Sequence, residues 1–455
     1  MIKEFEGKGI KKIHFIGIAG VSMSSLAKFV KEQGYEVSGS DRNNCQDDFT
    51  DCGIKVFTGH DESNLSGVDA VVYNSAINSE NPEFAAAIKK SLPIYMRAQL
   101  LSAVCDGFDK CVGIAGCHGK TTVCSMVSTI FKYCEMKFYA HVGGYDVDFG
   151  NYYYSGNDYI VSEVCEYKRN IKYFNPTIAC LLNVAPDHMD CYESVDDLLN
   201  EYFDFLDKGK LRVYNGDDNY LKNYKNDNVV TFGLNKNNSV RAVDLKLRGG
   251  KYSFKVVENG NVVGEVNLKI YGLHSVYNAL AAFTAGWCCG IKPQDIIEAL
   301  NGYKGVIRRF ENIGKLCGAE VIADYAHHPD EIEESIKTAT YICDKNLHII
   351  FQPHTYSRTK FLFDNFIKVF KNIDNIAIFK TFSAREKPQD GYDGKCLSEH
   401  LPQSKYFENI DELLSYEQSR LSSGDVLLVL GAGDIYNLIK DKLTVKNCFK
   451  LKSDK

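Results

Sequence analysis

The stretch from Lys110 to Val123 combines residue types at a spacing suited to holding a polyphosphate. Apolar residues lead into glycines at 113, 116 and 119, and Lys120 and Thr121 follow. Glycines let a backbone wrap a phosphate chain, and the N–H groups of a following helix face the anion. The lysine would reach the β- and γ-phosphates, and the threonine hydroxyl would bind Mg²⁺. The strict G-x-x-x-x-G-K-[ST] pattern is not met, because Gly113 stands one residue early, so an incidental glycine-rich turn is the alternative.

An earlier unit, residues 12–42, has the pattern of a strand, a glycine turn, a helix and a second strand ending at Asp41. An acidic residue there can hold a ribose diol. The G-x-G-x-x-G fingerprint is degraded to Gly17, Ala19 and Ser22, which disfavours a redox dinucleotide. A nucleotide-sugar diphosphate in the same crevice, or a merely structural turn, remains open.

Polar residues also follow two later apolar runs. Glu163 ends the run 159–163, and Asp187 and His188 follow the run that begins at Ile178. Ligands of α/β proteins bind at the carboxyl ends of parallel strands, and an acid near a phosphate loop is what Mg²⁺ needs. The alternative is a solvated turn acid with a loop histidine.

The last third of the chain places arginine, histidine, aspartate or glycine at four expected strand ends. These ends converge on one sheet edge, which suggests a domain that closes over an active site. The paired His327 and His328 could bind zinc, but no thiolates or carboxylates accompany them at ligand spacing, so zinc is disfavoured.

Composition excludes several classes of protein. At 455 residues the chain is long enough for two to four domains, and 45% hydrophobic with 25% charged residues is typical of globular proteins. A net charge of −6 without a basic run gives no reason to expect a nucleic-acid or membrane partner. The 16 scattered cysteines, with no signal peptide or membrane span, indicate reduced thiols in a cytoplasmic protein.

Together these motifs resemble the Mur ligases of peptidoglycan synthesis across nearly the whole chain. The matching stretches are Gly17–Met23, Gly39–Asp41, Gly116–Thr122, Asn183–Asp190, Arg308–Glu311, Asp324–Pro329, Phe351–His354, Tyr356–Thr359 and Gly431–Ile435. Each stretch is weak by itself, but their order and spacing are specific.

The resemblance implies an α/β fold of three domains. These are a Rossmann-like UDP-sugar domain over residues 1–105, a central ATP-binding domain over 106–304, and a Rossmann-like amino-acid domain over 305–455. The central domain would have a P-loop ATPase-type parallel sheet with a small β excursion over 210–270. The implied reaction uses ATP and Mg²⁺ to join L-alanine to the lactyl carboxylate of UDP-N-acetylmuramate through an acyl phosphate, in a monomer or homodimer.

The resemblance also assigns roles to residues. The phosphate loop would be Gly116, Cys117, His118, Gly119, Lys120, Thr121 and Thr122, with Asn278, Arg309 and Asp324 also contacting the nucleotide. Mg²⁺ would be bound by Thr121, Glu163 and His188. The sugar nucleotide would contact Gly17, Ala19, Gly20, Ser22, Asp41, Ser75 and Arg97. Tyr325, His327, His354 and Arg358 would line the amino-acid side, and the catalytic set would be Lys120, Glu163, His188, His327 and Arg358.

The chain departs from the family pattern at several positions. Ala19 and Ser22 replace glycines, the acidic stretch is reduced to Glu163–Lys168, and Thr355 replaces an arginine. A recycling ligase that attaches a preformed tripeptide to the same sugar nucleotide therefore remains an alternative. A catalytically impaired binding protein and an NAD(P)-dependent oxidoreductase are further alternatives, disfavoured by the retained Lys120 and Thr121 and by the mid-chain phosphate loop.

Overall fold

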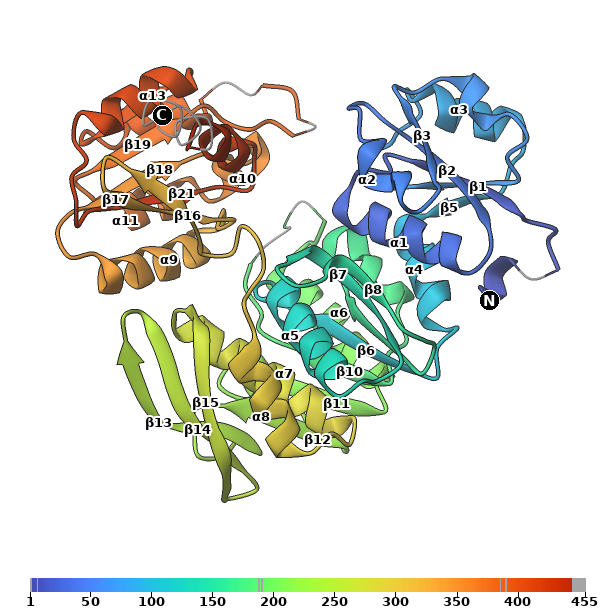
Figure 1. Ribbon diagram of the computed structural model, residues 1–455, viewed down its shortest axis with the longest axis horizontal. Coiled ribbons are helices and arrows are strands. Elements are labelled where there is room, and N and C mark those ends of the chain that lie inside the picture. Colours follow the sequence, from blue (N-terminus) through green and yellow to red (C-terminus); the bar gives the residue numbers. More distant parts are fainter. Residues whose placement is uncertain are drawn as a thin grey trace, which may run out of the picture. The chain divides into compact units, whose positions relative to one another are not determined.

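The computed structural model describes residues 2–5, 7–186, 189, 191–384, 386–388 and 391–443, and the counts below refer to these. The strands form three sheets (Figure 1). The chain divides into two compact units. One holds the first two sheets, and the other holds the third sheet together with Lys246–Tyr252 and Ile270–Ser275. The α/β fold with parallel sheets expected from the sequence is confirmed.

The first sheet has the strand order β3-β2-β1-β4-β5, and every neighbouring pair is parallel. Its strands are β1 (Lys12–Ile16), β2 (Glu36–Asp41), β3 (Lys55–Thr58), β4 (Ala70–Tyr73) and β5 (Ile94–Met96). Its α-helices are α1 (Val21–Glu32), α2 (Asp47–Thr50), α3 (Pro82–Lys89) and α4 (Arg97–Cys105). The central strand β1 and its neighbour β4 are mostly apolar and buried, as strands covered on both faces must be.

The second sheet has ten strands in the order β15-β14-β13-β12-β11-β10-β6-β9-β7-β8. Its parallel part contains β6 (Lys110–Ala115), β7 (Phe138–Asp146), β9 (Tyr159–Glu163), β10 (Ile178–Leu181), β11 (Leu211–Asn215) and β12 (Val229–Gly233), with β8 (Gly150–Tyr154) antiparallel at one edge. The expected excursion over 210–270 extends this sheet through β13 (Val240–Arg248), β14 (Lys251–Glu258) and β15 (Asn261–Tyr271). Its α-helices are α5 (Lys120–Tyr133), α6 (Val195–Lys208), α7 (Leu273–Cys288) and α8 (Pro293–Gly302).

The first two sheets share one continuous apolar core. Phe29 of α1 stacks on Tyr139 of β7 with ring centroids 4.4 Å apart. Figure 1 shows α1 and α4 on the side of the first sheet that faces β7 and β8. Burial of large aromatic side chains at this junction fixes the first sheet against the second.

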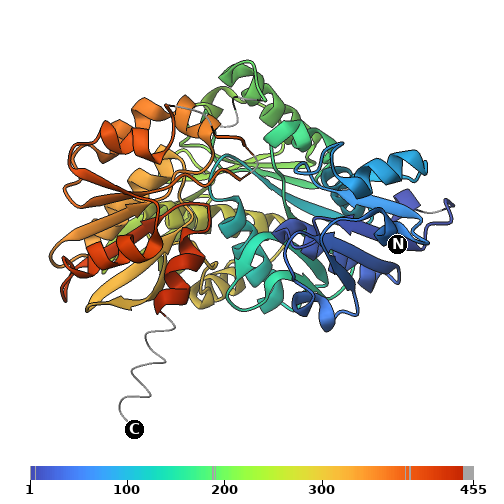
Figure 2. The ribbon, with the colours of Figure 1, turned by 90° about the horizontal axis from the view of Figure 1, so that it is seen from above.

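The third sheet has the order β16-β17-β21-β18-β19-β20, and only the β16–β17 pair among these described strands is antiparallel. Its strands are β16 (Glu311–Leu316), β17 (Ala319–Asp324), β18 (Leu347–Phe351), β19 (Ile376–Phe379), β20 (Ser404–Phe407) and β21 (Val426–Leu430). Its helices include α9 (Pro329–Ile342), α10 (Tyr356–Phe361), α11 (Phe363–Phe370), α12 (Gly394–Glu399) and α13 (Ile410–Gln418). Figure 2 shows helices on both faces of this orange-to-red sheet, and a separate apolar core lies on each face.

Candidate active site

The phosphate loop is the turn between β6 and α5, as the sequence pattern predicts. Gly116 and Gly119 have φ angles of +131° and +86°, which favour glycine. A Cβ atom on Gly119 would lie 2.5 Å from Oδ1 of Asn278, so this amide packs directly against the loop. The loop residues 116–119 and the first turn of α5 therefore form one backbone cradle whose N–H groups suit an anion.

Asn183, which the sequence reasoning did not assign to the site, holds this loop in place. Its Oδ1 accepts from the His118 N–H at 2.9 Å, its Nδ2 donates to the His118 carbonyl at 2.9 Å, and its own carbonyl accepts from the Cys117 N–H at 3.2 Å. The available signal was its position directly after the apolar strand β10, at the same sheet edge as the loop.

Lys120 is held over the loop by a buried carboxylate. Its Nζ lies 3.0 and 3.1 Å from the two carboxylate oxygens of Glu166, and it donates to the carbonyls of Gly116 and Cys117. Burial disfavours the ammonium, but Glu166, itself 1% exposed, outweighs this and raises the pKa of Lys120. Lys120 is therefore a permanent cation, and Glu166 is a second residue that the sequence reasoning did not assign.

Thr121 and Glu163 meet beside the loop. The Thr121 hydroxyl donates to Glu163 Oε2 at 3.3 Å, and the Gly143 N–H donates to the other carboxylate oxygen. Any side chain on Gly143 would overlap that carboxylate. A hydroxyl and a carboxylate this close are oxygen donors of the kind Mg²⁺ prefers. His188, the third residue expected at this site, lies outside the described residues.

Several of the residues expected to bind the sugar nucleotide gather at the end of β1 and the start of α1. The N–H groups of Gly17 and Ile18 donate to the Ser40 carbonyl at 2.8 and 3.0 Å, and the Ala19 N–H donates to Asp41 Oδ2 at 3.2 Å. Gly20 is the N-cap of α1. The turn is thus anchored to the end of β2, where an anion would face the helix N-terminus.

Two further expected residues make hydrogen bonds in the same compact unit. Arg97 NH1 donates to the Ser22 hydroxyl at 2.9 Å. The Ser75 carbonyl, just after β4, accepts from Lys168 Nζ at 3.3 Å. Both contacts lie within the first compact unit.

The third sheet brings together the residues expected on the amino-acid side. His327 Nδ1 lies 2.9 Å from the Tyr325 carbonyl, and its ring centroid is 5.8 Å from that of His354. Arg358 NH1 lies 3.2 Å from His354 Nδ1. Arg309 lies over the Tyr325 ring, with its guanidinium carbon 5.0 Å from the centroid.

Asp324, at the end of β17, is half-buried beside these residues. Burial raises its pKa, against the opposing effects of the Ser335 hydroxyl, Arg309 and His274. His274, which the sequence reasoning left as an ordinary capping or surface residue, is exposed in the first turn of α7, and desolvation by the surrounding protein lowers its pKa.

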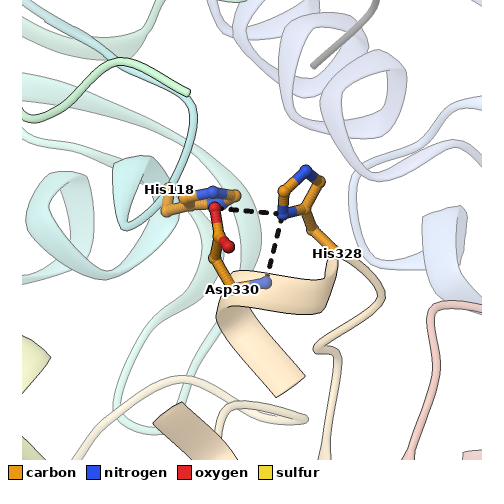
Figure 3. Close-up of side chains that lie close together, drawn as sticks. All are labelled: His118, His328 and Asp330. Carbon is orange, nitrogen blue, oxygen red and sulfur yellow. Dashed lines mark hydrogen bonds and ion pairs between the residues drawn. The ribbon is translucent and has the colours of Figure 1, made fainter. Parts of the chain in front are cut away.

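His328 has a structural role. It is the N-cap of α9, where its Nδ1 accepts from the Asp330 N–H at 3.3 Å (Figure 3), and Pro329 occupies the first helical turn. The two adjacent histidines therefore differ in use, because His327 turns toward His354 while His328 caps a helix.

Comparison with known proteins identifies the class. Family models for the Mur ligase family catalytic domain, the Mur ligase middle domain and the Mur ligase glutamate ligase domain match residues 12–109, 114–286 and 308–433. The chain belongs to the Mur ligase family, and it is an ATP-dependent ligase that forms an amide bond.

Individual relatives carry a narrower name. The chain is 37% identical over 442 residues to the UDP-N-acetylmuramate–L-alanine ligase of Clostridium acetobutylicum, covering 94% of this chain and 96% of that one. It is 38% identical to that of Clostridium beijerinckii over 440 residues, with 93% and 96% covered. The crystal structure of UDP-N-acetylmuramate–alanine ligase from Thermotoga maritima superposes with a TM-score of 0.82 at 27% identity, covering 98% of this chain and 100% of that chain.

Among the described residues, no helix has the length and apolar character needed to cross a membrane.

Proposed function

We propose that the protein joins L-alanine to UDP-N-acetylmuramate in the synthesis of peptidoglycan precursors. The observation that carries the proposal is the close pairing of Thr121 with Glu163 beside Lys120, in a chain whose similar relatives bear this ligase name along nearly their whole length. Because both substrates besides alanine are nucleotides, the cytoplasm is the proposed location.

The chemistry needs two displacements. A carboxylate oxygen of the sugar's lactyl group attacks the γ-phosphorus of ATP, which forms an acyl phosphate and releases ADP. The alanine amine then attacks the acyl carbon, the C–N bond forms, the amine loses a proton, and phosphate leaves. A carboxylate is a poor acyl donor, so the work of the protein is positioning and charge neutralisation.

The residues divide this work among three regions, which we propose as domains with the bounds 1–105, 106–304 and 305–455. Lys120 and the loop N–H groups would neutralise the ATP phosphates, with Asn278, Arg309 and Asp324 contacting the nucleotide. The turn at Gly17–Ser22, with Asp41, Ser75 and Arg97, would hold the sugar nucleotide. Tyr325, His327, His354 and Arg358 would bind the amino acid.

We further propose that the ATP site takes Mg²⁺. The Thr121 hydroxyl and the Glu163 carboxylate, 3.3 Å apart, would hold the ion, with His188 assigned by resemblance. When bound, the ion would neutralise charge on the ATP phosphates. Here Glu163 would exchange its hydrogen bond from Thr121 for a metal–oxygen contact.

The test is an ADP-release assay with purified protein. We expect ADP only when UDP-N-acetylmuramate, Mg²⁺ and a small amino acid are present together, and equal ATP turnover without the sugar nucleotide would overturn the proposal. Alanine, glycine, serine and the preformed tripeptide are compared as acceptors. Faster turnover with the tripeptide would identify a recycling ligase instead.

A matched pair of lysine variants tests the loop assignment. Lys120→Ala should abolish turnover while binding of the sugar nucleotide survives. Lys132→Ala, on the exposed face of the same helix α5, should keep wild-type activity. Retained turnover in Lys120→Ala would show that the loop is misassigned.

A further inference from the structure

The first turn of α1 is hydrogen-bonded to the second sheet at several points. Asn151 Nδ2 donates to the Val21 carbonyl at 2.7 Å, and the hydroxyls of Ser25 and Tyr139 lie 2.9 Å apart. His141 Nε2 lies 2.9 Å from the Ser22 hydroxyl oxygen. The turn expected to hold the sugar nucleotide is thus fixed directly to β7 and β8.

His141 differs from the other contacts because it reaches both substrate regions. Its side chain is 2% exposed, and its Nδ1 lies 3.3 Å from the hydroxyl of Ser162, the residue before Glu163. Burial lowers the pKa of His141 to about 3, so the ring is neutral near neutral pH and carries a single proton.

The neighbours of the two ring nitrogens bear on where that proton lies. Nε2 also lies 3.3 Å from the Ser22 carbonyl oxygen, which can only accept a hydrogen bond. With the proton on Nε2, the ring donates to Ser22, and Nδ1 accepts from the Ser162 hydroxyl, whose other acceptor is the Glu163 carbonyl at 3.2 Å. The hydroxyl oxygen of Ser22 then has two donors, His141 Nε2–H and Arg97 NH1, both at 2.9 Å.

A serine oxygen with two donors must direct its own O–H to a third partner. Ser22 is half-buried in the first turn of α1, which follows the Gly17–Gly20 turn in the chain. An anionic oxygen is the strongest acceptor that such a hydroxyl can meet.

We propose that His141 is a positioning residue that turns the Ser22 hydroxyl into a fixed donor to the diphosphate of the sugar nucleotide. The inference rests on the proposed function for the identity of that ligand. Ser22 stands where the family resemblance leads us to expect glycine. Its hydroxyl would donate a hydrogen bond that a glycine cannot donate from a side chain. The link through Ser162 further ties the donor's position to the strand that carries Glu163.

A purely structural role for His141 makes a different prediction, and Asn151 provides the matched control. Asn151 is buried and also binds the first turn of α1. Its Nδ2 donates to the Val21 carbonyl and to the Ser24 hydroxyl, and among the described residues it makes no hydrogen bond to Ser22. If His141 only fastened the helix, Asn151→Ala and His141→Phe would weaken ligand binding alike.

The experiment measures the dissociation constant of UDP by calorimetry on the full chain. His141→Phe and Ser22→Ala should each weaken UDP binding about tenfold, which is the loss expected for one hydrogen bond to a charged group. The double variant should bind no more weakly than either single variant, because both remove the same donor. Asn151→Ala should change UDP binding less than twofold, and ATP binding should be unchanged in all variants.

Several results would overturn the inference: UDP binding unaffected by His141→Phe, losses that simply add in the double variant, or an equal loss in Asn151→Ala. If His141→Phe does not fold, Ser22→Ala decides, because a donating hydroxyl predicts the same loss. Wild-type protein that binds UDP but releases no ADP with the proposed substrates would refute the proposed function alone. Wild-type protein that turns over normally while the variants bind UDP as tightly would refute the role of His141 alone.

Discussion

Replacing Glu83 by glutamine tests how the first sheet supports the sugar-nucleotide turn. Glu83 is fully buried, and its carboxylate meets His60 Nδ1 at 3.0 Å, the Ser40 hydroxyl at 2.5 Å and Asn64 Nδ2 at 2.7 Å, with His14 Nε2 at 3.4 Å. The backbone carbonyl of Ser40 accepts the two N–H groups that shape the turn. The carboxylate therefore holds the strand end on which the turn depends.

The expected loss of stability in Glu83→Gln follows from the pKa of the Glu83 carboxyl group. Burial opposes ionisation, but hydrogen bonds from His14, Ser40 and Asn64 outweigh it and lower the pKa of Glu83 from 4.5 to about 2. At about 1.4 kcal/mol per pKa unit, this difference corresponds to about 3 kcal/mol of stability. Because the folded-state pKa is depressed, this stabilisation is complete above pH 4.5 and is lost as the pH falls toward 2.

Amide hydrogen exchange measures this contribution locally, without requiring the whole chain to unfold in one step. At pH 7, Glu83→Gln should lower the opening free energy of peptides covering 12–16 and 36–41 by up to about 3 kcal/mol. At pH 3 the difference from wild type should fall to less than half, after correction for intrinsic exchange rates. Glu80→Gln, on an exposed residue just before α3, is the control and should have no effect. An equal difference at both pH values would refute the electrostatic reasoning.

Three further predictions concern the ATP and amino-acid sites. Glu166→Gln removes the carboxylate that raises the pKa of Lys120, so its turnover should fall at a lower pH than that of wild type, and coincident pH–rate profiles would contradict this. Gly119→Ala, with φ +86° and a Cβ 2.5 Å from an amide oxygen, should weaken ATP binding at least about tenfold by calorimetry, whereas Gly150→Ala, with φ +73° and open space, should not. Arg358→Lys should raise the KM for the amino acid about tenfold with little change in the KM for ATP, because lysine cannot reproduce the planar guanidinium, and an unchanged KM would contradict the assignment.

The phosphate loop was predictable because its signals are local. An apolar strand, glycines at positions that need positive φ, and a helix beginning at Lys120 all lie within one short stretch of chain. The same holds for Asp41 at the end of β2, since strand ends follow directly from the apolar pattern.

Glu166 and His141 were not predictable in this way, because their roles depend on partners far along the chain. His141 and Ser22 are 119 residues apart, and Lys120 and Glu166 are 46 apart. The residues next to a single histidine or glutamate in the sequence do not show whether its side chain lies on the surface or is buried in a hydrogen bond. Only the tertiary fold, which places β9 beside β6 and packs α1 against β7, brings these pairs together.

Thr355 differs from the residue expected at this position, yet the proposed amino-acid site around it is still formed. Its φ of +66° and ψ of 147° are costly for a β-branched residue, by about 1–3 kcal/mol. Hydrogen bonds to neighbouring residues stabilise this strained conformation. The Thr355 N–H donates to the Phe382 carbonyl at 2.9 Å, and the N–H groups of Tyr356 and Ser357 donate to the Glu386 carboxylate. A backbone kept in this conformation directs the next helical turn so that Arg358 reaches His354. Thr355, where the resemblance leads us to expect an arginine, therefore supplies no guanidinium, while the hydrogen-bonded backbone still presents Arg358 to His354, which favours an altered amino-acid preference over an abandoned site.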